Sequence, residues 1–355
     1  MALLPPLFIA AALLAAPDSG PALVRPLSDF ATAQTPAPAD QASRLTDGAR
    51  REVILRLADL IETRYVYPDR GAALAGALRR DAGRFREEDP ETFAAALTAR
   101  LRDLSQDGHF AVEHRRPGTD EAEGGADAAH MEAQLERWYG VGVNHGFEAV
   151  RRLDQGVGYL DLRVFAPTDM GGDLMAAAMT LLAQSPALII DLRHNGGGMG
   201  EMVLMLEAYL LDGSAEVSGG YDRPSDTHTR AFTPSWVPGR RFGGDKPVFI
   251  LISKRTFSAA EALAYDMQAM GRATIVGEAS GGGAHPFEYR AITPDFILSL
   301  PEGRSINPIT GADWQGAGVQ PDVVVEPERA LETALQLARD AIRTGPTADG
   351  QPGGR

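Results

Sequence analysis

Apolar residues follow two spacings along the chain, and each spacing predicts a different kind of element. Between residues 50 and 104 they recur every three or four positions, which is typical of amphipathic helices. Further on, nearly unbroken apolar runs at 187–192, 246–254 and 273–276 are typical of strands buried on both faces. Helical patterns at 170–182, 202–209 and 258–270 lie between or beside these runs. Strands that alternate with helices predict an α/β core, here preceded by a small helical domain.

Composition divides the chain into segments. Residues 1–16 are apolar and too short for a membrane span, which is typical of a secretory signal peptide, so 1–44 are predicted to be a signal peptide with a disordered lead-in. The helical domain is predicted at 45–116 and an acidic, glycine-rich linker at 117–136. The α/β domain should occupy 137–343, and residues 344–355 form a predicted disordered tail. The signal peptide predicts export to the periplasm or the medium.

Charge and cysteine content exclude several classes of function. The 355 residues carry a formal net charge of -14, which argues against a nucleic-acid partner and against docking on an anionic membrane. The chain has no cysteine, so disulfides, thiolate metal sites and cysteine nucleophiles are excluded. It also lacks a His-Glu-x-x-His motif. We therefore expect neither a metal nor an organic cofactor.

A glycine turn follows the apolar run at 187–192. Gly196, Gly197 and Gly198 separate this predicted strand from the next helix, an arrangement that presents backbone N–H groups to an anion. The known phosphate-binding glycine patterns are absent. From the residues alone, the turn is either a site for a transient oxyanion or simply a tight turn.

Ser258 stands directly after a predicted buried strand, where a helix begins. A serine there is usually an N-cap. It could instead be a nucleophile, with the N–H of Ala259 stabilising an oxyanion. The Gly-x-Ser-x-Gly elbow is absent around it, which argues against an α/β-hydrolase.

Five segments resemble one known family. They are NHGFEAVRRLDQGVGYLDL (144–162), DLRHNGGG (191–198), TFSAAEALAYDMQAMGRATIVGE (256–278), GGGAHP (281–286) and LPEGRSINPITGADWQGAGVQPDVVV (300–325). Together they resemble the serine peptidase family of the C-terminal processing proteases, the tricorn core and interphotoreceptor retinoid-binding protein, and the retinoid-binding-protein-like branch most closely. The resemblance implies a crotonase-like α/β core after a helical domain. The gap between His109 and Asn144 leaves no room for a PDZ domain.

The resemblance also implies catalytic roles. Ser258 takes the nucleophile position, and Gly283 stands where the processing proteases have their lysine. A Ser/His mechanism remains, with His109 as the matching base. Gln315 stands where the branch has a glutamate. Its carbonyl can still accept the Nδ1–H bond of His109, but an amide cannot stabilise an imidazolium by charge. The alternatives are a slow enzyme, an enzyme that uses another carboxylate, or a protein that is not an enzyme.

Other residues receive supporting roles. His285 is the alternative base, with a structural or substrate-contacting role favoured, and His194 is a possible site-lining residue or an exposed loop residue. Glu261 is expected to hold the start of its helix or a neighbouring loop. The resemblance makes the glycine turn one wall of an oxyanion hole, with a backbone N–H of Gly196 or Gly197 facing that of Ala259. Asp191 and Arg193 should brace this turn.

Two functions of different classes follow. The first is an exported serine endopeptidase that acts on peptides or proteins, supported by Ser258, His109 and the glycine turn. The second is a non-catalytic protein on the same fold that binds an apolar ligand or a peptide. Gln315 favours the second function, or a weakened enzyme.

Overall fold

The computed structural model describes residues 44–115, 132 and 134–344. The predicted signal peptide, the lead-in up to residue 43, linker residues 117–131 and 133, and tail residues 345–355 lie outside the described residues. The described linker residues, 132 and 134–136, are helical. In the part of the chain that is described, no helix combines the length and apolarity needed to cross a membrane.

Three helices form the N-terminal region, as the helical spacing predicts. They are α1 (Asp47–Arg64), α2 (Pro68–Asp81) and α3 (Pro90–Ser105). Side chains start two of them, because Thr46 accepts the N–H of Ala49 and Asp89 accepts that of Thr92. The third helix ends at Gln106, whose φ of 55° lies in the left-handed region.

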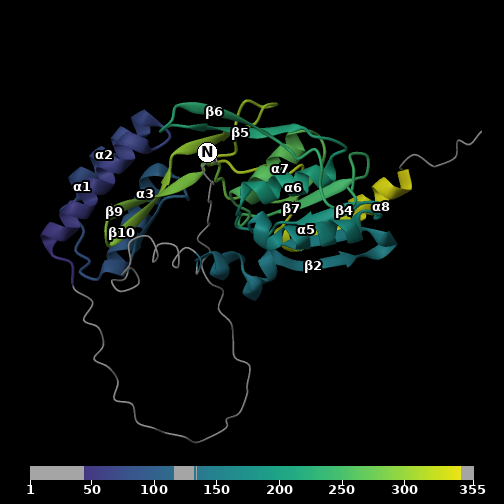
Figure 1. The fold of residues 1–355 in the computed structure, drawn as a ribbon, viewed down its shortest axis with the longest axis horizontal. Helices are drawn as coiled ribbons and strands as arrows, with labels where there is room; N and C mark the ends of the chain where they lie inside the picture. The colour runs from purple at the N-terminus through teal and green to yellow at the C-terminus, as the bar shows by residue number, and fades with distance from the viewer. Residues whose placement is uncertain (1–43, 116–131, 133, 345–355) are drawn as a thin grey trace, which may run out of the picture.

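A sheet made from distant segments completes this helical region. Strand β1 (Ala111–His114) pairs with β10 (Phe296–Pro301), and β10 pairs with β9 (Phe287–Thr293), all antiparallel. Leu298 and Phe296 of β10 share one hydrophobic cluster with Leu57 and Phe93 of the helices. The helical region therefore has no core independent of residues 287–301, and this strand contribution is not visible in the helical spacing (Figure 1).

A mixed sheet of six strands forms the centre of the α/β core. Its order is β12-β8-β7-β4-β3-β2, and only the pairing of β2 with β3 is antiparallel. The strands are β2 (Phe147–Arg152), β3 (Gly158–Leu162), β4 (Leu188–Asp191), β7 (Val248–Ile252), β8 (Thr274–Gly277) and β12 (Val323–Val324). Short 3-10 helices, Val141–Gly146 and Asp154–Gly156, flank β2.

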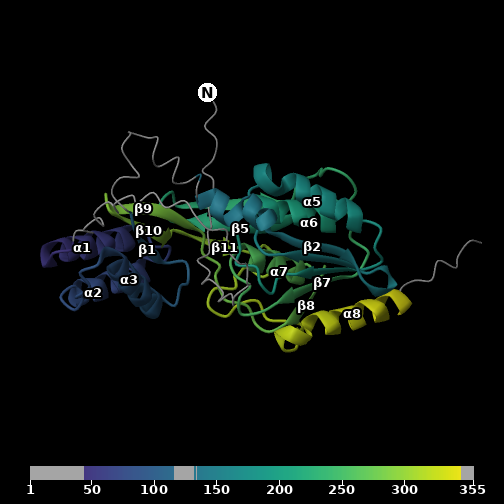
Figure 2. The ribbon, with the colours of Figure 1, turned by 90° about the horizontal axis from the view of Figure 1, so that it is seen from below.

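Helices cover both faces of this sheet, which explains the unbroken apolar runs. Leu188 and Ile190 of β4 pack in the cluster of α5 (Thr168–Leu182), α6 (Gly200–Leu210) and α7 (Ala259–Ala269). Ile189, which points to the opposite face, packs with Ala334 of α8 (Pro327–Thr344). Figure 2 shows α8 on the side of the sheet opposite to α5 and α6. The predicted α/β core after a helical region is confirmed; its crotonase-like assignment stays a prediction.

A third sheet lies between these two parts. Strand β5 (Glu216–Asp222) is central, with β6 (Thr227–Phe232) on one side and β11 (Gly303–Ile306) on the other. Figure 1 shows β5 and β6 running along the upper edge of the molecule, above α6 and α7. Residues of β5 and β6 line one cavity together with residues of α6 and α7.

Candidate active site

Ser258 adopts an uncommon backbone conformation at the junction of β7 and α7. Its φ is 52° and its ψ is -119°, in a region that side-chain-bearing residues rarely occupy. Such a conformation costs about 1–3 kcal/mol and persists only where surrounding contacts impose it. The residue is 9% exposed and stands at the N-cap position of α7. Ser258 is therefore held in a strained turn that opens onto a helix N-terminus.

Glu261 supplies much of the restraint on this turn. Its fully buried carboxyl group accepts the backbone N–H of Ser258 at 2.8 Å, and those of Gly282 and Gly283 at 2.6 and 2.8 Å. The hydroxyl of Ser280 donates to it at 2.5 Å. Burial raises the pKa of Glu261 to about 7, although these hydrogen bonds oppose the rise. The expectation that Glu261 holds a neighbouring loop agrees with these contacts, because it ties Ser258 to residues 280–283.

The glycine turn packs directly against Ser258. A Cβ at Gly197, whose φ is 114°, would lie 2.9 Å from the Cβ of Ser258. Only glycine permits this approach. The N–H of Gly197, however, donates to Oδ1 of Asn195 at 2.8 Å, so the turn itself already uses this N–H.

Gly198 has a different backbone environment. It forms a parallel bridge with Phe165, in which Phe165 N–H donates to Gly197 C=O and Met199 N–H donates to Phe165 C=O, both at 2.8 Å. In such a bridge the N–H of the central residue points away from the partner. Gly198 lines a cavity of about 990 Å³ together with Ser258 and Ala259. Gly196 and Gly197 are not among the described residues that line it.

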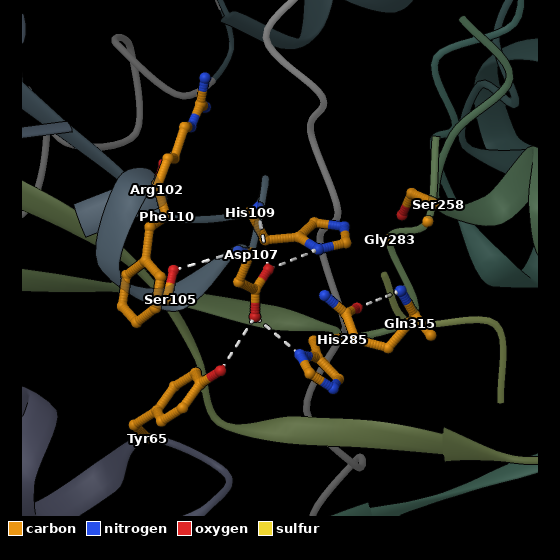
Figure 3. A network of polar contacts seen from close by, with 12 residues as sticks. Tyr65, Arg102, Ser105, Asp107, His109, Phe110, Ser258, Gly283, His285 and Gln315 are labelled. Carbon is orange, nitrogen blue, oxygen red and sulfur yellow. Dashed lines mark hydrogen bonds and ion pairs between the residues drawn. The ribbon is translucent and has the colours of Figure 1, made fainter. Parts of the chain in front are cut away.

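Asp107 lies at the centre of a buried network that includes two histidines (Figure 3). Its Oδ2 accepts a hydrogen bond from His285 Nδ1 at 2.6 Å and a long one from the Tyr65 hydroxyl at 3.4 Å. Its Oδ1 accepts the backbone N–H of His109 at 3.1 Å and lies 3.4 Å from Nδ1 of the same residue. Since a carboxylate only accepts, Nδ1 of His285 donates the proton of its bond to Asp107, whereas Nδ1 of His109 faces Asp107 without a hydrogen bond.

Asp107 is a carboxylate despite its burial. Burial by itself would raise its pKa, but hydrogen bonds from His109 and His285, and the charges of these histidines, outweigh burial and hold the pKa well below its usual range. Sequence reasoning assigned Asp107 no role. The available signal was the Asp-Gly-His spacing, which places a carboxylate two residues before the predicted base.

His109 has one ring nitrogen facing Asp107, and among the described residues neither ring nitrogen has a hydrogen-bond partner. Its side chain is 1% exposed, and its ring lies 4.7 Å from that of Phe257 and 5.7 Å from that of Phe287. Figure 3 shows the imidazole on the side of Asp107 that faces Ser258. Within the described ranges no hydrogen bond joins His109 to Ser258.

The expected hydrogen bond from His109 to Gln315 does not form. Oε1 of Gln315 instead accepts the backbone N–H of Ala284 at 2.8 Å. The next residue, Gly316, donates its N–H to the C=O of Gly282 at 2.8 Å, so this segment is occupied in holding the 282–284 loop. The carboxylate beside His109 comes from Asp107, because both residues belong to the same turn after α3. This corrects the contact inferred from the resemblance.

The remaining predicted residues divide between the network and its surroundings. His285 is fully buried with its ring 5.3 Å from that of Tyr67, and it contacts Asp107 rather than the cavity. His194 is half-buried and is not among the described cavity-lining residues. Burial, followed by the charges of nearby arginines, lowers the pKa of His194. The structure therefore groups His285 with His109 and leaves His194 apart.

Asp191 and Arg193 form a brace at the end of β4. Arg193 donates to both carboxylate oxygens of Asp191, at 2.9 and 2.6 Å, and to the C=O of Pro327 at 2.5 Å. The hydroxyl of Tyr159 adds a bond to Asp191 at 2.8 Å. These contacts connect the start of the glycine turn to α8, in agreement with the expected bracing role.

The arrangement of fold and site defines a class of protein before any relative is considered. A strained serine at a helix N-terminus, a glycine turn packed against it and a nearby histidine–carboxylate pair are the parts that serine-type peptidases use. Among the described residues, no cluster of histidine and carboxylate side chains could hold a metal ion.

Comparisons with known proteins relate part of the chain to one family. Residues 156–325 match the model of peptidase family S41. Over 201 residues the chain is 28% identical to a carboxy-terminal-processing protease of Bartonella bacilliformis, a match that covers 54% of this chain and 44% of that relative. The chain thus spans less than half the length of that curated relative. Residues 156–325, just under half of the chain, are thus similar to peptidase family S41.

Solved structures share the fold at low identity. A CPAF mutant matches with a TM-score of 0.61 and 12% identity, over 85% of this chain and 99% of that one. A lipoprotein from Streptococcus agalactiae matches with a TM-score of 0.57 and 15% identity, over 82% and 96% of the two chains. The tricorn protease matches with a TM-score of 0.51 and 12% identity, over 83% of this chain and 37% of that protein. These likenesses concern the fold alone.

Proposed function

We propose that this protein is an exported serine endopeptidase in which Ser258 is the nucleophile, His109 the base and Asp107 the carboxylate that orients it. One observation carries the proposal: the strained Ser258 stands beside a histidine whose Nδ1 faces a buried carboxylate and whose Nε2 has no other described partner. An unpartnered buried nitrogen is costly unless it is used. Proton transfer from Ser258 is a use that fits its position.

The reaction follows from these positions. Oγ of Ser258 attacks the peptide carbonyl carbon while Nε2 of His109 takes the hydroxyl proton. His109 then gives this proton to the leaving amine, and a water molecule releases the acyl group by the same steps in reverse. Asp107 stabilises the transient imidazolium. Because catalytic hydrogen bonds often tighten only when substrate binds, the missing His109–Ser258 bond in the free protein is compatible with this sequence of steps.

Asp107 changes the interpretation of Gln315. The amide at position 315 cannot stabilise a positive imidazolium, but the Asp107 carboxylate carries the required charge. It lies 3.4 Å from Nδ1 of His109, so it also favours the tautomer in which Nε2 is free to accept a proton. In this proposal Gln315 positions the 282–284 loop through Ala284.

The oxyanion hole is assigned to the N–H groups of Ala259 and Gly198. Ala259 is the first residue of α7, where backbone N–H groups lack helical partners. Gly198 points its N–H away from Phe165 and lines the same cavity. The N–H of Gly197 is engaged by Asn195, so we place the second donor at Gly198 rather than at Gly196 or Gly197. Two such donors stabilise the negative oxygen of the tetrahedral intermediate.

The same proposal includes peptide or protein substrates and export of the protein. The family supports peptide or protein substrates, and the cavity of about 990 Å³ beside Ser258 is large enough for several side chains. Export rests on the apolar residues 1–16. The crotonase-like character of the core rests on the sequence resemblance.

Labelling with a fluorophosphonate probe tests the catalytic roles directly. We expect the wild-type protein to be labelled, and labelling to be lost in Ser258→Ala and strongly slowed in His109→Ala and Asp107→Asn. Gln315→Glu should be labelled at nearly the wild-type rate. Circular dichroism of each variant controls for folding. Labelling that survives His109→Ala but disappears in His285→Ala would show that the base is His285.

A binding protein on the same fold is the second candidate. Two observations favour it: no hydrogen bond links His109 to Ser258 among the described residues, and apolar residues such as Val203, Val217 and Trp314 line the cavity. In that case the folded wild-type protein would not react with the probe. An apolar ligand or peptide would still raise its melting temperature.

A further inference from the structure

His285 is a buried histidine to which the proposed reaction gives no part. It is 1% exposed, and the centre of its ring lies 5.3 Å from that of Tyr67 and 6.5 Å from that of Tyr65. Its Nδ1 donates to Oδ2 of Asp107 at 2.6 Å, whereas its Nε2 has no hydrogen-bond partner among the described residues. An apolar ring would fill the same space without burying an unpaired nitrogen, so packing alone does not account for a histidine here.

The bond between His285 and Asp107 connects the two parts of the protein that carry the proposed base and the proposed nucleophile. Asp107 lies in the turn after α3, and His285 lies 178 positions further on, in the 282–286 loop. Two backbone N–H groups of this loop donate to the carboxyl group of Glu261, which also accepts the N–H of Ser258. The loop is therefore bonded to the start of α7 at one end and to the carboxylate beside the base at the other.

The two oxygens of Asp107 have different partners (Figure 3). Oδ2 accepts the bond from His285, while Oδ1 accepts the backbone N–H of His109 at 3.1 Å and lies 3.4 Å from Nδ1 of the same residue. A carboxyl group bonded at both oxygens cannot rotate without losing one bond, so His285 keeps Oδ1 directed at His109. Burial alone would raise the pKa of Asp107, and donors such as His285 reverse this effect. The bond thus helps Asp107 to stay charged as well as oriented.

We propose that His285 is a positioning residue for the peptidase reaction, because its Nδ1–H holds the Asp107 carboxylate toward His109 and ties this pair to the loop behind Ser258. The inference rests on the proposed function and adds to it a residue that acts through Asp107. His285 is not among the described residues that line the cavity, so no contact with substrate is assigned to it. Misplacement of a catalytic group by about 1 Å can slow a reaction by about 10²-fold, so a residue that only positions the base can still control the rate.

A double-mutant cycle tests whether His285 acts through Asp107. Fluorophosphonate labelling is measured for the wild type, His285→Phe, Asp107→Asn and the double variant, with circular dichroism as the folding control. We expect folded His285→Phe to be labelled at least about tenfold more slowly than the wild type, and the same substitution to change the rate less than about twofold in the Asp107→Asn background. Equal slowing in both backgrounds would show a merely structural role and overturn the inference, as would an unchanged rate in His285→Phe.

A conservative replacement separates hydrogen-bond donation from packing. Asparagine places an N–H donor near the position of Nδ1, so His285→Asn should restore labelling to within about threefold of the wild-type rate. The matched control is His228→Phe, which makes the same exchange at an exposed histidine outside the cavity lining and should leave the rate unchanged. If folded His285→Asn is labelled no faster than folded His285→Phe, the role of the Nδ1–H bond is contradicted.

A measurement on inactive protein separates this inference from the catalytic proposal. Nuclear magnetic resonance of Ser258→Ala protein with ¹⁵N-labelled histidine reports which nitrogen of His109 carries the proton, and the signals of His109 are those missing in His109→Gln. We expect the Nδ1–H form in Ser258→Ala, a mixture of forms after adding His285→Phe, and the Nδ1–H form again after adding His285→Asn. An unchanged form in His285→Phe would contradict the inference. The expected changes in a protein that the probe does not label would contradict only the peptidase.

Discussion

Gly283 occupies the position where the resembling processing proteases carry a lysine, and the structure shows why no side chain fits there. A Cβ at this position would lie 2.2 Å from Cζ and 2.4 Å from Cε2 of Phe257, and 2.8 Å from Cε1 of His109. The loop cannot easily move away, because the N–H of Gly283 donates to Glu261 and its C=O accepts the indole N–H of Trp314 at 2.8 Å. We therefore expect Gly283→Ala to displace the Phe257 ring and with it His109.

The expected cost of this substitution follows from overpacking. Contacts this short force a ring in the interior to shift by about 1 Å, and overpacking of this kind typically costs about 1–3 kcal/mol. Unfolding in urea, followed by circular dichroism, measures the free energy of unfolding. Gly213→Ala is the matched control, because a Cβ at Gly213 meets nothing within 4 Å, and its effect should stay within about 0.5 kcal/mol. Labelling of Ser258 should also slow in Gly283→Ala, since the proposed base is displaced.

A double-mutant cycle isolates the proposed cause. In a Phe257→Ala background the two shortest contacts vanish, so Gly283→Ala should cost at least about 1 kcal/mol less than in the wild type. An unchanged cost in that background, or a cost below about 0.5 kcal/mol in the wild type, would refute the steric reasoning. The same reasoning predicts that Gly283→Lys does not create a Ser/Lys dyad.

Three further predictions follow from the site. The pKa of Glu261 is raised in the folded protein from 4.5 to about 7, so its contribution to stability is complete below pH 4.5 and is lost as the pH rises to about 7. Relative to Glu261→Gln, wild-type unfolding free energy should fall by about 3 kcal/mol over this range in urea titrations, and parallel pH profiles would contradict this. Asp107→Asn should slow fluorophosphonate labelling by up to about 10⁴-fold, whereas Gln315→Glu should hardly change it; the opposite ranking would return the orienting role to position 315. Asp191→Ala leaves Arg193 without its carboxylate and should cost about 3–5 kcal/mol in thermal or urea unfolding, and a loss below about 1 kcal/mol would show that Arg193 finds other partners.

Local sequence patterns were sufficient to predict the main helices and buried strands, and to place Ser258 at the start of a helix. The apolar run at 187–192 predicts a strand buried on both faces, and β4 does pack against α5–α7 on one side and α8 on the other. The serine at the start of the 258–270 helix and the glycine turn are visible in the sequence for the same reason. Helix spacing, buried-strand composition and glycine clusters depend on neighbours close along the chain.

Contacts between segments far apart in the chain could not be predicted from the sequence. The helical region depends on β9 and β10, which lie almost 200 residues further along the chain. Glu261 reaches the 280–283 loop, and Asp107 joins His285 across 178 positions. Motif matching pointed to Gln315 as the partner of His109, but the amide is occupied by Ala284. A motif records which residue types recur, whereas the partner of a buried side chain depends on which atoms the folded chain brings within hydrogen-bond distance.

The sequence by itself determined the α/β class, most of the helices and buried strands, and the position of Ser258 at the start of a helix. Tertiary structure alone decided that a carboxylate two residues before His109 faces this histidine, and that His285 donates to the same carboxylate. The physical reason is the same in both cases. Periodicity and turn chemistry act over a few residues, but the protonation and partners of buried polar groups are set by desolvation and by donors from remote segments.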